Sequence, residues 1–135
     1  MEINLAIQII VCVVQLMIVL HTFHSLFVKD KTKLDKIAWT FPLGSLFVCS
    51  LLSFMGDRLG LSVNLLDTLG ASIASNECLL FYFVGAWASD RYQKNTIIYP
   101  KWLRFGSIGF KYITLGLGVL LTLVAIADLI LYVIA

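Results

Sequence analysis

Glu77 is the residue of this chain best placed to do chemistry, because it is acidic and lies within a long apolar stretch. About 13 residues, or roughly 20 Å of helix, separate it from Asp90, the next charged residue. If this stretch crosses a bilayer, a charge at such depth costs on the order of 3 kcal/mol, and residues of this kind usually face a bundle interior or water. Glu77 therefore predicts a proton-binding, water-lining or hydrogen-bonding role.

Gln15 is the predicted partner of Glu77, since it lies 14 residues before Lys29 and hence at a similar height in the membrane. A protonated Glu77 that donates a hydrogen bond is the structural alternative to a charged group that lines water. Polar or small side chains also recur at helical spacing in all the apolar stretches: Gln8, Gln15, Thr22, Ser45, Cys49, Ser53, Gly70, Ala74, Cys78, Ala71, Ser75, Thr114, Gly118 and Thr122. Such stripes predict helix contacts, within one chain or between copies, or a water-lined path. Ser75, Asn76 and Glu77 form a consecutive polar run that extends around more than one side of its helix.

Two other acidic residues have simpler interpretations. Asp67 follows Asn64 by three residues, an arrangement that resembles a capping box with Asn64 as the N-cap. Asp128 lies seven residues before the last residue, so a tilted helix would bring it to the outer headgroups; the alternative is a role in the polar interior.

Metal and catalytic sites find little support in the sequence. His21 and His24 stand at i and i+3, but two histidines without further ligands make an incomplete site, and we expect them at the membrane interface. The three cysteines show no CxxC spacing and are interpreted as small packing residues. There is no nucleophile elbow, phosphate-binding glycine loop or paired-carboxylate spacing. The sequence therefore predicts neither an enzyme nor a cofactor.

The elements that must position these residues are membrane-spanning helices. Of the 135 residues, 60% are hydrophobic and only 13% are charged, against about 25% charged in a soluble domain. A span needs about 20 apolar residues, and the charges separate four stretches of that length. The prediction is an all-α polytopic membrane protein, one domain over residues 1–135, with antiparallel neighbouring helices at about 3–28, 37–55, 65–89 and 107–135.

The basic residues predict the orientation of the bundle. The second connection holds Arg58 alone, whereas the first and third connections with their flanks hold nine of the ten basic residues: Lys29, Lys31, Lys33, Lys36, Arg91, Lys94, Lys101, Arg104 and Lys111. By the positive-inside rule these two connections face the cytoplasm. Both termini are then expected outside, in a bacterial inner membrane.

Residues 90–106 are predicted to form a loop that lies in the headgroup layer, because cations alternate there with aromatic and aliphatic residues. Pro100 could begin a short helix, with Trp102 and Phe105 as anchors. We expect this loop and the one at 29–36 to bind anionic lipid or a cytosolic protein partner. The loop is too short and too close to the bilayer to predict nucleic-acid binding.

Residues 60–65, Gly-Leu-Ser-Val-Asn-Leu, together with the Gly-, Ala- and Ser-containing span after them, resemble the start of the last span of lambda-type phage holins. The resemblance covers about 20 residues. It implies a small protein that oligomerises in the inner membrane and permeabilises it. The chain differs from that family in its four predicted spans and in the lack of charge after Asp128.

Three functions are consistent with these features, all of them in a homo-oligomer. The first is a pore-forming or membrane-perturbing protein, holin-like or an effector. The second is a membrane sensor or anchor subunit, as in antiviral defence of bacteria, that recruits a cytosolic partner to the basic loops. The third is a small transporter coupled to protonation of Glu77.

Overall fold

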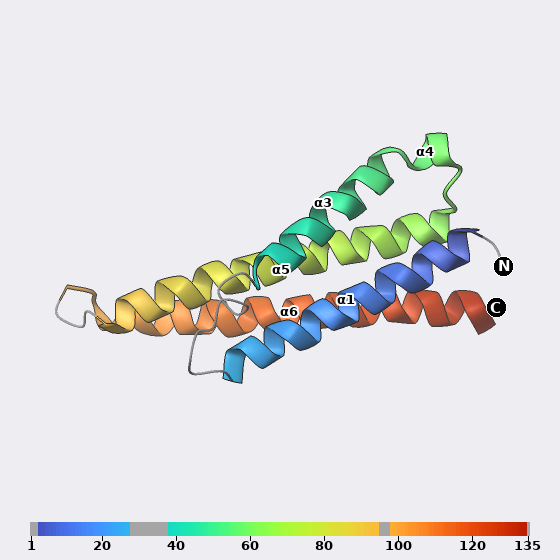
Figure 1. Ribbon diagram of the computed structural model, residues 1–135. Helices are drawn as coiled ribbons and strands as arrows, with labels where there is room; N and C mark the ends of the chain where they lie inside the picture. The colour runs from blue at the N-terminus through green and yellow to red at the C-terminus, as the bar shows by residue number, and fades with distance from the viewer. Residues whose placement is uncertain (1–2, 28–37, 95–97, 135) are drawn as a thin grey trace.

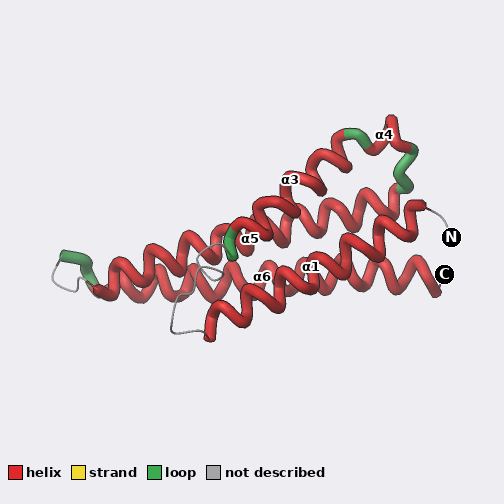
Figure 2. Tube along the Cα trace, in the orientation of Figure 1, coloured by secondary structure: helices red, strands yellow, loops and turns green. Residues whose placement is uncertain are grey.

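The computed structural model describes residues 3–27, 38–94 and 98–134, and helices account for all of the regular structure in these ranges. The helices are α1 (Ile3–Phe27), α3 (Thr40–Phe54), the short α4 (Gly56–Leu59), α5 (Val63–Lys94) and α6 (Lys101–Ile134). Figure 1 shows their arrangement, and Figure 2 shows how little of the described chain lies in loops and turns. The predicted all-α class is confirmed.

Three of these helices, α1, α5 and α6, are long and apolar enough to cross a membrane. With 25, 32 and 34 residues they extend roughly 37, 48 and 51 Å, against about 30 Å for the hydrocarbon core. These lengths and compositions indicate a membrane protein. Helix α3 has 15 residues, or roughly 22 Å, and is shorter than a full span. The fourth span therefore stays a prediction.

The predicted loop at 90–106 is largely helical, which corrects the expected boundaries. Helix α5 continues to Lys94 and α6 begins at Lys101. As expected, Pro100 precedes a helix: its carbonyl accepts hydrogen bonds from the amides of Leu103 (3.2 Å) and Arg104 (3.3 Å). The helix that follows is the whole of α6 and not a short separate one. A charged side chain needs water or headgroups around it, but its backbone can remain helical. The position of the charges therefore does not predict where a helix ends.

Helix α5 is the centre of the molecule, since it packs against α6 most extensively and also contacts α3 and α1. Helices α5 and α6 lie side by side as an antiparallel pair, and both continue past the ends of α1 and α3 (Figure 1). The N-terminus, the C-terminus and α4 lie at the same end of the molecule, opposite the α5–α6 turn. Helices α1, α3 and α6 are thus arranged around α5.

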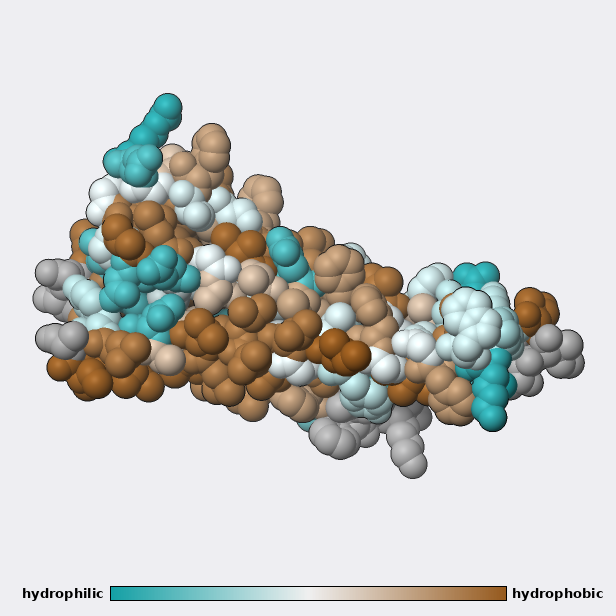
Figure 3. Space-filling view, turned by 180° about the vertical axis from the view of Figure 1, so that it is seen from behind, coloured by the Kyte–Doolittle hydropathy of each residue, from teal (hydrophilic) through white to brown (hydrophobic). Residues whose placement is uncertain are grey.

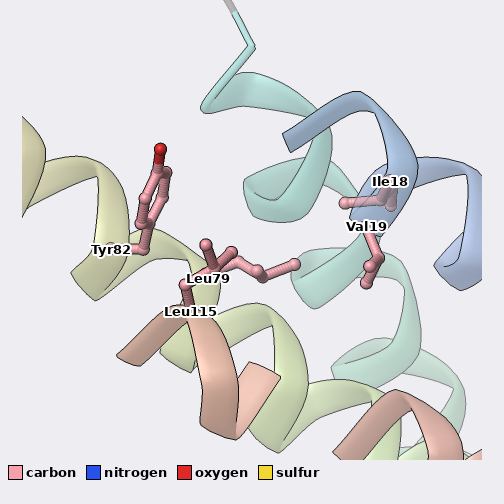
Figure 4. Close-up of a cluster of buried hydrophobic side chains, with 5 residues drawn as sticks. All are labelled: Ile18, Val19, Leu79, Tyr82 and Leu115. Atoms are coloured by element: carbon pink, nitrogen blue, oxygen red, sulfur yellow. The ribbon is translucent and has the colours of Figure 1, made fainter. Parts of the chain in front are cut away.

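Two apolar clusters fill the interior between the helices. The larger joins α1, α5 and α6 through five buried residues: Ile18, Val19, Leu79, Tyr82 and Leu115. In Figure 4 the Leu79 side chain lies beside Leu115 and extends toward α1, and the Tyr82 ring is directed to one side. The smaller joins α3 to α5 through three further buried residues: Cys49, Leu65 and Leu69. Ile7 and Val11 of α1 also pack against this smaller cluster, so α1 contacts α5 along both clusters and α3 joins it at one.

The turn between α4 and α5 has its own local determinants. Gly60 ends α4 with φ of +67°, a conformation in which a Cβ would be strained. The hydroxyl of Ser62 accepts a hydrogen bond from the amide of Leu65 (3.3 Å), so Ser62 caps the start of α5 in place of the predicted Asn64. Asn64 lies inside the helix, since α5 begins at Val63.

The surface agrees with a membrane setting. Hydrophobic residues cover most of the middle of the face in Figure 3, and hydrophilic residues gather toward the two ends, near α4 and near the α5–α6 turn. The exposed side chains of α1 between Ile9 and Leu20, and those of α6 between Ile113 and Ile134, are all apolar. These surfaces suit contact with lipid chains.

Gly118 should be the position of α6 that tolerates a side chain least. A Cβ there would lie 2.9 Å from Cδ2 of Leu79, a fully buried side chain, whereas a Cβ at Gly116 would meet nothing within 4 Å. We expect Gly118→Val to lower the free energy of unfolding by about 1–3 kcal/mol through overpacking. Gly116→Val is the matched control and should change it little. Unfolding by SDS in mixed micelles measures both, and equal losses would contradict the packing described here.

Candidate functional site

Two glutamines of α1 are bonded to α5 at equivalent heights. Gln8 Nε2 donates to Thr68 Oγ1 (2.9 Å), and Gln15 Nε2 donates to Ser75 Oγ (3.0 Å). All four side chains are buried. Both pairs are separated by 60 residues, so the two helices run in the same direction along the chain. Since successive pairs recur after seven residues on each helix, this contact has the spacing of a parallel coiled coil.

Ser75 connects three helices through one hydroxyl group. Besides accepting from Gln15 of α1, its Oγ donates to the carbonyl of Gly118 in α6 (2.7 Å) and lies 2.8 Å from Thr122 Oγ1. The Thr122 hydroxyl also lies 2.9 Å from the same carbonyl. The close approach of α6 that these distances require is possible because Gly118 has no side chain. The hydrogen bonds and the apolar packing therefore hold the same three helices.

Helix α3 joins this layer through Asn76, which follows Ser75. Asn76 Nδ2 donates to Ser45 Oγ (3.1 Å), and Ser45 in turn lies 3.9 Å from the Cys49 sulfur. Helices α1, α3, α5 and α6 thus each contribute a hydrogen-bonding group to one layer across the bundle. The polar stripes predicted on α1 and α6 lie inside the protein, where Gln8, Gln15, Thr22, Thr114, Gly118 and Thr122 are all buried.

The layer retains hydrogen-bonding capacity that the described residues do not use. Three of the five buried atoms that have no hydrogen-bond partner among those residues lie at or next to this layer: Gln15 Oε1, Ser72 Oγ and Asn76 Oδ1. Ser72 and Asn76 stand at i and i+4, so they lie on one face of α5. Each such group costs about 1–3 kcal/mol when it stays unsatisfied.

Glu77 lies outside this layer, which corrects the predicted pairing with Gln15. Gln15 bonds to Ser75 instead, and Glu77 is exposed. The reason is geometric: two residues rotate a helix by about 200°, so Glu77 and Ser75 face nearly opposite directions. The sequence placed both residues at the right height but could not show which one faces α1.

Glu77 belongs to a continuous outward face of α5, here called the Glu77 face and defined as Asp67, Gly70, Ala74, Glu77 and Phe81. Their spacing alternates between three and four residues, which keeps them on one side of the helix. Ala74 is half-buried and the other four are exposed. A Cβ added to Gly70 would meet nothing within 4 Å. The Phe81 ring packs edge to face against Phe110 of α6, with centroids 6.2 Å apart. The rest of this face carries two carboxylates and two small residues, three of these four exposed.

The remaining predicted residues are spread over the molecule. Asp128 is half-buried in α6, and His24 is exposed on α1. His21 packs edge to face against Phe41 of α3, with ring centroids 5.3 Å apart. Among the described residues, no three His, Cys, Asp or Glu side chains come together as metal ligands would. Lys29, Lys31, Lys33 and Lys36 lie outside the described residues.

The basic and aromatic residues near the α5–α6 turn pack against one another. The Arg91 guanidinium lies 5.5 Å from the ring centre of Trp87, and the Lys101 ammonium lies 5.7 Å from that of Phe105. Arg91, Lys101 and Trp102 are exposed, Arg104 is half-buried, and Lys94 is the last residue of α5. Cations over aromatic rings at a helix end are typical of the headgroup layer.

Thr68 and Ser72 were not among the residues that the sequence indicated, whereas Ser45 and Ser75 were named only as members of polar or small stripes. A signal was present, since Thr68, Ser72, Ser75 and Leu79 follow one helical face with spacings of four, three and four. The small residues Gly70 and Ala74 form a similar stripe on the opposite side. Periodicity alone could not show which of the two stripes faces the bundle.

The hydrogen bond between Gln15 and Ser75 should be measurable by a double-mutant cycle. We expect Gln15→Leu and Ser75→Ala to destabilise the protein individually and to show a coupling energy of about 0.6–1.7 kcal/mol in SDS unfolding. Gln15→Leu combined with Thr68→Ala is the control, because Thr68 binds Gln8, roughly 10 Å away along the helix. Coupling of the same size in the control pair would contradict a specific bond.

Comparison of the chain with known protein families, with characterised proteins and with solved structures finds no match. The buried polar layer and the exposed Glu77 face are therefore the features from which a function is proposed.

Proposed function

We propose that this chain is a four-span membrane protein that assembles through the Glu77 face into a cation-conducting pore. The parallel direction of α1 and α5 supports four spans. If both helices cross the bilayer in the same direction, the chain between them has to return across it, and α3 with α4 is the segment available. In this arrangement α3 crosses most of the hydrocarbon, and α4, which carries the exposed Asp57 and Arg58, lies at the outer headgroups.

The proposed orientation has both termini outside. The termini lie at the same end of the molecule as α4, away from the α5–α6 turn. That turn is flanked by Arg91, Lys101 and Arg104, whereas the α4 end has Arg58. The positive-inside rule then directs the α5–α6 turn to the cytoplasm.

One observation carries the proposal for assembly: Glu77 is exposed halfway along an apolar helix. An uncovered charge at this depth costs on the order of 3 kcal/mol. The cost is removed when the same faces of several copies meet around water. Gly70 and Ala74 favour such a contact, because small residues let helix backbones approach closely. The apolar surfaces of α1 and α6 then remain toward lipid.

The Glu77 face also supports cation conduction. In a ring of copies, Glu77 and Asp67 would form two rings of carboxylates, ten residues or roughly 15 Å apart along the pore. Rings of acidic side chains select cations, and a ring of Phe81 would narrow the pore further along. Gln15 and Asn76 play no part in this pathway, because both are buried inside each copy. Pore formation also agrees with the holin resemblance of residues 60–65.

Replacing Glu77 should change ion selectivity. We expect Glu77→Gln to lower the ratio of K⁺ to Cl⁻ permeability, and Glu77→Lys to reverse it, because the ring charge is first removed and then inverted. Reversal potentials in planar bilayers under a KCl gradient measure this ratio. Asp57→Asn, which removes an exposed carboxylate of α4, is the matched control and should leave it unchanged. Absence of conductance from the purified protein would refute the pore, and unchanged selectivity in Glu77→Gln would exclude Glu77 from it.

Assembly should depend on the small residues of the Glu77 face. We expect Gly70→Leu to shift the protein from oligomer to monomer, because the new side chain has room within one copy but separates neighbouring α5 helices. Gly116→Leu adds the same side chain at an equally open position of α6. Size-exclusion chromatography with light scattering in mild detergent measures the mass. If both variants keep the wild-type mass, assembly does not use this face.

A further inference from the structure

The α5–α6 pair is longer than the hydrocarbon that it crosses. Helix α5 extends roughly 48 Å and α6 roughly 51 Å, against about 30 Å of hydrocarbon. Both helices continue past the ends of α1 and α3 on the side of the α5–α6 turn (Figure 1). This end of the pair is here called the tip and is defined as residues 87–94 and 98–105.

The register of α1 against α5 shows how far the tip extends. Gln15 bonds to Ser75 and the two helices are parallel, so Phe27, the last residue of α1, is level with Trp87. From there α5 continues for seven residues, or roughly 10 Å, to Lys94. The headgroup layer on each side of a bilayer is about 5–8 Å thick. The tip therefore extends beyond α1 by about the thickness of one headgroup layer.

Aromatic and basic side chains are exposed together at the tip. Trp87, Trp102 and Phe105 are 63%, 74% and 61% exposed. Arg91 and Lys101 are exposed as well, and their cationic groups lie 5.5 and 5.7 Å from the ring centres of Trp87 and Phe105. An aromatic ring attracts a cation without neutralising its charge. Both cations therefore keep their charge for an anion.

The charge of this end of the molecule favours an anionic partner. From Asp90 to Lys111 the sequence holds five basic residues and one acidic residue, a net charge of +4. Helix α4 and the first turns of α5, at the other end, hold Asp57, Arg58 and Asp67, a net charge of −1. An anionic surface therefore attracts the tip and not the α4 end.

The length of the helices favours lipid over a cytosolic protein as that partner. A bilayer with its headgroups is about 40–45 Å thick. At a tilt of about 30°, which is within the range of membrane helices, the 51 Å of α6 span roughly 44 Å of this thickness. The tip then reaches the phosphate groups of the nearer leaflet without leaving the bilayer. Tryptophan is enriched at this depth.

We propose that the tip binds the phosphate groups of anionic phospholipids, with Arg91 and Lys101 as hydrogen-bond donors. Guanidinium and ammonium groups form short, charge-assisted hydrogen bonds with phosphate oxygens. The rings of Trp87, Trp102 and Phe105 lie among the headgroups and ester groups of the same lipids. This surface is separate from the Glu77 face, and the proposal does not depend on pore formation.

Fluorescence quenching by brominated lipids tests the proposal on the full chain in vesicles. The chain has three tryptophans, so Trp39→Phe combined with Trp87→Phe leaves Trp102 as the reporter. The vesicles consist of phosphatidylcholine with a fixed fraction of one lipid that is brominated near the ester end of its acyl chains. We expect brominated phosphatidylglycerol to quench Trp102 more strongly than brominated phosphatidylcholine, and 1 M salt to reduce the difference.

Removing one cation of the tip should weaken this preference for phosphatidylglycerol. In the Trp102 background, Arg91→Gln and Lys101→Gln should each lower it by up to about fivefold. Arg58→Gln is the matched control, because it removes an exposed arginine at the α4 end, and it should leave the preference unchanged.

Equal quenching of Trp102 by the two brominated lipids would overturn the proposal. So would strong quenching by aqueous acrylamide with little quenching by either lipid, because the tip would then lie in water, where a protein partner could cover it. A preference that stays the same in Arg91→Gln and Lys101→Gln would refute their role. If the Trp102 background does not fold, native mass spectrometry of phosphatidylglycerol retained by the wild type, Arg91→Gln and Lys101→Gln decides the question.

Discussion

A polar side chain in a bilayer has to find its partner inside the protein, because the hydrocarbon offers none, and in this chain Ser75 meets that requirement for three helices. Its hydroxyl accepts a hydrogen bond from the side-chain amide of Gln15 in α1 and donates one to the Gly118 carbonyl of α6. The neighbouring Asn76 adds α3 through Ser45. Helices in lipid gain no hydrophobic drive from association, so these contacts fix which faces meet. The apolar clusters then pack around them.

The sequence could predict the helices and the buried stripes of α1 and α6, because a face with regular polar spacing has one clear direction. It could not do so for α5, where Ser75, Asn76 and Glu77 are consecutive and point in three directions. Height in the membrane follows from counting residues, but the direction of a side chain depends on where the neighbouring helices pack. The predicted hydrogen bond between Gln15 and Glu77 was wrong for this reason. The predicted height of Glu77 relative to Gln15 agrees with the structure, because Gln15 bonds to Ser75, two residues before Glu77.

The predicted ends of the helices also agree with the structure only in part. Charges from Asp90 onward did not mark the end of α5, since a helix satisfies its backbone hydrogen bonds internally and can continue past its apolar part. The predicted span at 37–55 agrees with α3 to within one residue at its end, Phe54, but α3 begins only at Thr40, after the turn residues Ala38 and Trp39. The polarity of the side chains determines whether a segment is stable in lipid. Local backbone geometry, such as the positive φ of Gly60 after α4, determines where a helix ends.

The parallel pairing of α1 with α5 has a consequence for how the protein is made. Thr68 and Ser75 leave the ribosome 60 residues after Gln8 and Gln15. At about 5–20 residues per second, α1 waits on the order of 3–12 s before its partner is synthesised. During that time its two glutamines are in the membrane or at the insertion machinery without the hydroxyl groups they will bind. Insertion of α1 therefore requires that the favourable transfer free energy of its aliphatic residues outweighs the cost of the two unbonded amides until α5 is synthesised.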